Sequence, residues 1–75
     1  MSNAVDLFIY EKGNEAPIYE ETYTYYLDAF RFAKETLNII SIDNSHYALI
    51  RQLRSDGRYQ IDRIGEDKYH SHFNI

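Results

Sequence analysis

Residues 25–38, with the sequence YYLDAFRFAKETLN, carry the helical period that decides the fold class. Four apolar residues recur there at i, i+4, i+7 and i+11, which is the spacing of one face of an α-helix. They are Tyr26, Phe30, Ala33 and Leu37. Thr24 is the expected N-cap and Asn38 the expected residue after the last turn. We therefore expect one amphipathic helix over residues 25–38.

The segments on both sides of this helix have the composition of β-strands. The predicted strands are residues 5–11 (VDLFIYE), residues 18–23, a short strand at residues 39–43, residues 46–53 and the run after Gly57. This β-β-α-β-β-β order predicts an α+β fold, in which one helix packs on one face of a small antiparallel sheet. In the first strand both faces are apolar, which favours a position inside the sheet.

The strongest turn signal is SDG at residues 55–57, and it leaves two registers open for the hairpin. A two-residue loop would place Arg51 opposite Asp62. A three-residue loop with a left-handed glycine would place Leu53 opposite Tyr59. The two registers differ by one residue, so they bury opposite faces of the last strand.

Seventy-five residues predict a single domain, residues 1–75, with a small core. Residues 1–4 (MSNA) are interpreted as a short non-native or unstructured start. Residues 65–75 are polar and are expected either to pack as a sheet edge or to form a loose tail. The chain carries neither a long apolar run nor the basic and apolar regions of a signal peptide, so we expect a cytoplasmic protein without a membrane partner.

Composition excludes several classes of function. With 8 Lys+Arg against 12 Asp+Glu, the net charge is −4, which does not attract nucleic acid over long range. The chain contains no cysteine, so it has neither disulfides nor a thiolate nucleophile. Its three glycines are isolated, and phosphate-binding loops need clustered glycines. We expect no cofactor.

Two groups of residues have types found in catalytic or metal sites. Asp43, Ser45 and His46 are triad types, but three neighbours in a turn cannot converge as triad groups do, and turn stabilisation is the favoured role. His70 and His72 have the spacing of two ligands on one side of a strand, although this pattern is short and common. We predict neither an enzyme nor a metal site.

Charge is distributed unevenly along the chain. Residues 1–38 carry seven acids and three bases, whereas residues 39–64 carry three acids and four arginines. Those arginines belong to one hairpin, residues 51–63, and Arg54 and Arg58 flank its tip beside Tyr59. Arginine and tyrosine are enriched at interface hot spots, so these three residues are the predicted binding site. A solvated hairpin face is the alternative.

The chain also has eight tyrosines, more than a small core can bury with every hydroxyl satisfied. Four of them are interleaved with acids in residues 15–28, a segment that could face a basic partner or simply alternate into the core. The favoured hypothesis is a small protein-binding module, a regulator or inhibitor of the kind that phages and mobile elements encode. The alternative is a nucleic-acid contact through hairpin 51–63. Apolar faces on both sides of the first strand also predict a homodimer.

Overall fold

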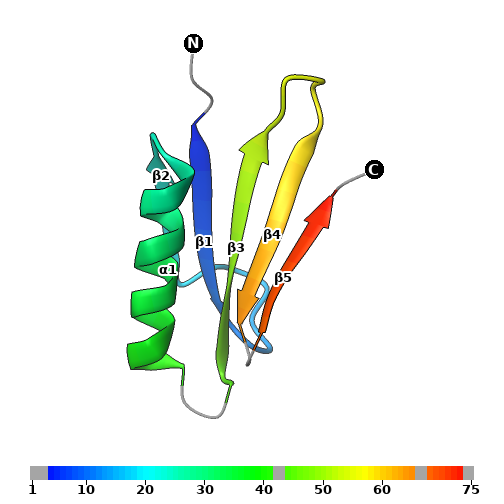
Figure 1. The fold of residues 1–75 in the computed structure, drawn as a ribbon. Coiled ribbons are helices and arrows are strands. Elements are labelled where there is room, and N and C mark those ends of the chain that lie inside the picture. Colours follow the sequence, from blue (N-terminus) through cyan, green and yellow to red (C-terminus); the bar gives the residue numbers. More distant parts are fainter. Residues whose placement is uncertain (1–3, 42–43, 66–67, 74–75) are drawn as a thin grey trace.

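The computed structural model describes residues 4–41, 44–65 and 68–73, and for the last of these ranges it describes the backbone. The described residues form one antiparallel sheet in the order β2-β1-β3-β4-β5, with a helix on one face (Figure 1). The elements are β1 (Val5–Glu11), β2 (Tyr19–Tyr23), α1 (Tyr26–Ile40), β3 (His46–Leu53), β4 (Tyr59–Gly65) and β5 (Lys68–Phe73). The predicted α+β fold is confirmed.

The helix connects two strands that lie on opposite sides of β1. Both β2 and β3 pair antiparallel with β1, so they run parallel to each other with β1 between them. Parallel strands cannot be joined by a tight turn, and a helical crossover is the usual connection. The connection β2-α1-β3 is therefore a split β-α-β unit, onto which β4 and β5 add antiparallel neighbours.

The core lies between α1 and one face of the sheet. Side chains alternate along each strand, so one set faces the helix and the other set faces away. In β1, β3 and β4 the fully or almost fully buried helix-facing residues are Val5, Leu7, Ile9, Ala48, Ile50, Asp62 and Ile64. The helix contributes Ala29, Ala33 and Leu37. Its two alanines have short side chains, which allow α1 to approach the strands closely.

The helix differs in three ways from the predicted one, and the first is that it ends at Ile40 rather than at residue 38. Its buried stripe includes Ala29, which the predicted stripe omitted, while Phe30 is only half-buried and Leu27 is 54% exposed. It also begins after Tyr25, which makes no side-chain capping bond, rather than after a Thr24 cap. The predicted stripe correctly included Ala33 and Leu37, and the structure adds Ala29 beside them on the face that meets the sheet.

The predicted short strand at residues 39–43 is wrong where the structure describes it. Ile39 and Ile40 form the last turn of α1, and the backbone NH of Ser41 donates to the carbonyl of Leu37 at 2.9 Å. The β-branched pair favours a strand, but Ile40 continues the stripe of Leu37 at i+3 and packs against the core. Tertiary packing therefore overrides local propensity. Residues 42–43 lie outside the described residues.

The hairpin between β3 and β4 has the three-residue loop of the second predicted register. Leu53 pairs with Tyr59, and the backbone NH of Arg54 donates to the carbonyl of Arg58 at 2.7 Å. Gly57 has a φ of 86°, the left-handed conformation that such a loop requires. This register places Asp62 on the helix-facing side of β4. Beyond β4, Lys68–Phe73 form the edge strand β5, the first of the two alternatives for this segment.

The only helix that the described residues form is too short and too polar to span a lipid bilayer. The architecture that matters for function is a sheet with one face under the helix and one face away from it.

Candidate binding surface

The tip of the β3–β4 hairpin projects beyond the rest of the sheet (Figure 1). Two backbone bonds fix it, one between Arg54 and Arg58 and one from the NH of Gly57 to the carbonyl of Arg54 at 3.0 Å. The carboxylate of Asp56 accepts a third bond from the NH of Arg58 at 3.0 Å. The loop is thus an ordered turn in which Asp56 has a local structural role.

All three residues of the predicted site are exposed at this tip, and Tyr59 is 40% exposed. Strand alternation separates them, however. Tyr59 lies on the face away from the helix, whereas Arg54 and Arg58 continue the parity of the helix-facing residues. The structure therefore brings Arg54 and Arg58 together across the hairpin but places Tyr59 beside a different arginine.

That arginine belongs to the face of the sheet away from α1, which we call the open sheet face. In the described part of the chain, α1 packs only on the opposite face. By strand alternation and register, the open sheet face consists of Asp6, Phe8, Tyr10, Glu20, Thr22, Tyr47, Leu49, Arg51, Leu53, Tyr59, Ile61 and Arg63. Most of these side chains are half-buried, because their neighbours on the same face cover them in part.

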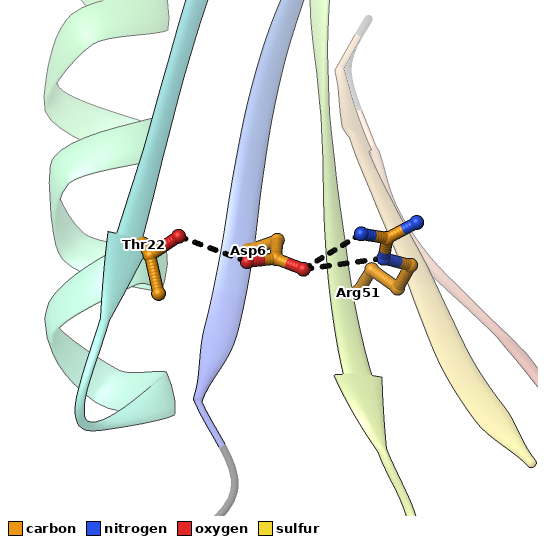
Figure 2. A network of polar contacts seen from close by, with 3 residues as sticks. All are labelled: Asp6, Thr22 and Arg51. Atoms are coloured by element: carbon orange, nitrogen blue, oxygen red, sulfur yellow. Dashed lines mark hydrogen bonds and ion pairs between the residues drawn. The ribbon is translucent and has the colours of Figure 1, made fainter.

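A polar network crosses three strands on this face (Figure 2). Asp6 on β1 accepts a hydrogen bond from the hydroxyl of Thr22 on β2 at 3.0 Å. Its other oxygen accepts from Nη2 of Arg51 on β3 at 2.8 Å and from Nε at 3.3 Å. The hydrogen bond to Asp6 raises the pKa of Arg51. The two hydrogen bonds to Asp6 hold the guanidinium in place beside β1.

The same guanidinium lies between two aromatic rings. Its central carbon is 5.3 Å from the ring centroid of Phe8 and 5.0 Å from that of Tyr59. Both distances are within the range of a cation–π contact. Arg51 thus connects β1 with the strand that follows the hairpin tip.

A second stack lies at the other end of the face. The rings of Tyr10 and Tyr47 are nearly parallel, with centroids 5.2 Å apart, and Arg63 lies 4.1 Å from the centroid of Tyr47. Tyr47 also pairs with Gly65, where an added Cβ would come within 2.7 Å of the Cβ of Tyr47. The glycine makes room for the tyrosine. Ring faces on the open sheet face are therefore in contact with one another or with arginines.

The residues of catalytic type form a local turn. The Oγ of Ser45 and Nδ1 of His46 are 2.7 Å apart, and the backbone NH of His46 donates to the Oγ of Ser41 at 3.2 Å. These bonds join residues no more than five positions apart, where the chain enters β3. Asp43 lies outside the described residues, and so do the side chains of His70 and His72.

In the described part of the chain, no group of three or more His, Asp or Glu side chains could hold a metal ion. The one buried charged residue of the described core is Asp62, and it is bonded rather than available as a ligand. It accepts hydrogen bonds from the hydroxyl of Tyr26 and from Nε2 of Gln60.

Sequence reasoning identified the exposed tip but did not identify the open sheet face as a surface. Arg51 and Arg63 were recognised as hairpin arginines, yet their ring contacts depend on the pairing of β1 with β3, which no local pattern specifies. One sequence feature did indicate this face, since β1 has apolar residues on both sides.

No protein-family model, curated protein or solved structure matches this chain.

Proposed function

We propose that this chain is a non-enzymatic protein-binding module that contacts its partner through the tip of the β3–β4 hairpin. The observation that carries this proposal is the exposed set of Arg54, Arg58 and Tyr59 on an ordered three-residue loop. Arginine and tyrosine are enriched among residues that dominate binding energy. A loop that is already ordered loses little conformational freedom on binding.

The tip is suited to an acidic protein surface. Two arginines flank it, and the carboxylate of Asp56 is engaged with the backbone of the loop. The chain as a whole carries a net charge of −4, so the tip is a local basic site on an acidic protein. A small module of this kind can regulate or inhibit a partner by occupying its surface, as expected of a regulator encoded by a phage or mobile element.

A nucleic-acid contact through hairpin 51–63 is the weaker candidate. Aromatic platforms bind single strands by stacking bases on free ring faces. Here the rings of Phe8 and Tyr59 contact Arg51, and the ring of Tyr47 lies between Tyr10 and Arg63. The net negative charge also opposes approach of a polyanion.

The test is affinity capture from the source cells with the immobilised protein, followed by a titration of the purified captured protein. We expect the double variant Arg54→Ala/Arg58→Ala to bind about 30-fold more weakly than the parent, as for one hot-spot residue. Tyr59→Ala should also weaken the complex. The control, Arg31→Ala/Lys34→Ala, removes two exposed charges from the helix and should bind like the parent. Equal binding by both double variants would contradict the proposal.

A further inference from the structure

Strand β2 is one edge of the sheet. In the described part of the chain its one strand neighbour is β1. The backbone NH and C=O groups of successive residues in a strand point to alternate sides, so about half of those in β2 point away from β1. An edge of this kind is a template on which another extended chain can add a strand.

The helix leaves this edge open. The buried sheet residues that the structure describes all belong to β1, β3 and β4, whereas the three central residues of β2 are exposed. Ile18, which immediately precedes the strand, is 52% exposed. Helix α1 packs mainly on β3 and β1, so β2 lies at the margin of the face that the helix covers. A strand added beside β2 would continue the sheet past this margin.

On the helix side of this edge, three aromatic rings form a cluster. The ring centroids of Tyr19 and Phe32 are 5.0 Å apart, and those of Tyr23 and Phe32 are 6.3 Å apart. The hydroxyl oxygens of the two tyrosines lie 3.3 Å from each other. All three residues are half-buried. The exposed part of each ring can therefore contact apolar side chains of an added strand.

The edge also carries acids on both faces of the sheet. Glu20 lies on the open sheet face and Glu21 on the helix side, and both are exposed. Within the described residues, neither carboxylate forms a salt bridge. Burial, the hydrogen bond with Tyr19 and the nearby carboxylates of Glu21 and Asp28 raise the pKa of Tyr23. Acids from β2 and α1 therefore act together on this edge.

These acids disfavour a second copy of this chain as the added strand. Pairing two β2 edges antiparallel about the middle of the strand would set Glu21 opposite Glu21 and Glu20 opposite Thr22. Like charges directly opposite each other destabilise a strand pair, whereas opposite charges stabilise it. Charged side chains protect a sheet edge against neutral or like-charged strands. They leave this edge open to a strand that carries lysine or arginine.

We propose that the β2 edge is a binding surface at which an extended, basic segment of another protein adds a strand to the sheet. Its backbone bonds to β2, its lysines or arginines pair with Glu20 and Glu21, and its apolar side chains contact Tyr19 and Phe32. The hairpin tip belongs to β3 and β4, on the other side of β1, and is suited to an acidic surface. This inference goes beyond the proposed function and does not depend on it.

The test uses a capped hexapeptide, Thr-Val-Lys-Lys-Val-Thr, titrated into the ¹⁵N-labelled protein and followed by NMR. Adjacent lysines point to opposite faces of a strand, so one can reach Glu20 and the other Glu21. We expect saturable shifts of the amide signals of residues 19–23, with a dissociation constant of about 1 mM or less.

Two control peptides separate strand addition from attraction by charge. One replaces both lysines with glutamate. The other is N-methylated at its four central residues, so it keeps both positive charges but loses the NH groups that an added strand needs. Each control peptide should bind at least about tenfold more weakly than the basic peptide.

Matched variants of the protein test the acids. Glu20→Gln/Glu21→Gln should raise the dissociation constant of the basic peptide about fivefold to tenfold. The control, Glu11→Gln/Glu35→Gln, removes the same charge from exposed residues outside β2 and should bind within about twofold of the parent. Equal affinities of the two double variants would overturn the proposal.

Two further results would also overturn it. One is equal binding of the N-methylated peptide, because charge alone would then attract the probe. The other is the absence of shifts at residues 19–23 with about 5 mM basic peptide. If the peptide fails to bind while Arg54→Ala/Arg58→Ala still weakens the complex with the captured partner, the β2 edge proposal is wrong and the proposed function stands.

Discussion

The hydroxyl of Tyr26, in the first turn of α1, donates a hydrogen bond to Oδ2 of Asp62 on β4. Asp62 is 1% exposed, so its carboxylate needs donors from the protein. Nε2 of Gln60 provides another at 3.2 Å. The bond between Tyr26 and Asp62 therefore joins the start of α1 to β4, a strand that lies outside the split β-α-β unit of β1, β2 and β3.

The first prediction concerns this bond. Tyr26→Phe removes one of the hydrogen-bond donors to the buried carboxylate of Asp62 and should lower the free energy of unfolding by about 1–3 kcal/mol. Urea unfolding measures the change. Tyr25→Phe is the control, because Tyr25 is 66% exposed. Equal stabilities of the two variants would mean that the bond does not contribute.

The second prediction tests the position of the core. Ile50 is fully buried beneath the helix, whereas Ile39 is 77% exposed in the last turn of α1. Ile50→Ala should cost about 2–5 kcal/mol, and Ile39→Ala should cost less than about 1 kcal/mol. Thermal or urea unfolding gives both values. A larger loss of stability in Ile39→Ala than in Ile50→Ala would show that a different side of the helix packs on the sheet.

The third prediction tests the pairing of β3 with β4. A methyl group on Gly65 would lie 2.7 Å from the Cβ and 3.1 Å from the Cα of Tyr47, so Gly65→Ala must displace the backbone of one of the two strands. We expect a loss of about 1–3 kcal/mol. Gly57→Asn is the control, because asparagine tolerates a left-handed φ and nothing lies within 4 Å there. A Gly65→Ala protein as stable as this control would refute the pairing.

The fourth prediction is a dependence of stability on alkaline pH. Burial and the hydrogen bond with Tyr19 raise the pKa of Tyr23 above its ordinary value of 10.0. The folded state then holds the phenol proton more tightly than the unfolded state does. The free energy of unfolding should therefore be constant below about pH 9 and fall as the pH rises above about 10.

Urea unfolding of the parent, Tyr23→Phe and Tyr25→Phe near pH 9 and about pH 11 tests this dependence. Tyr23→Phe should reduce the loss of stability between the two pH values. Tyr25→Phe should not, because Tyr25 is an exposed phenol. An unchanged loss in Tyr23→Phe would show that its proton is not linked to folding.

Much of the fold was predictable from local patterns. The bounds of β1 and β3 follow from short apolar or alternating runs that end at turn residues, and both match the prediction. The turn signal at residues 55–57 alone also predicted the two possible registers of the β3–β4 hairpin. The choice between the two registers depends on which side of β4 faces the helix. The structure places Asp62, a charged residue, on the helix-facing side, where Tyr26 and Gln60 donate hydrogen bonds to its carboxylate.

The end of the helix and the open sheet face were harder to predict for physical reasons. Ile39 and Ile40 have strand propensity, and only the packing of Ile40 on the core decides that the helix continues. The contact of Asp6 with Arg51 joins residues 45 positions apart and depends on the order of strands. Such nonlocal pairings follow from the whole sheet rather than from any one segment.

The most direct test of the central claim, that the hairpin tip serves a protein partner rather than nucleic acid, is fluorescence anisotropy with labelled mixed-sequence RNA and single-stranded DNA. The buffer should contain about 150 mM salt, because salt weakens binding through phosphate contacts. On single strands, the logarithm of the affinity falls with the logarithm of the salt concentration with a slope of about −0.7 per contact. The account predicts no binding by the parent chain at micromolar concentrations. Micromolar binding that disappears in Arg54→Ala/Arg58→Ala would contradict it.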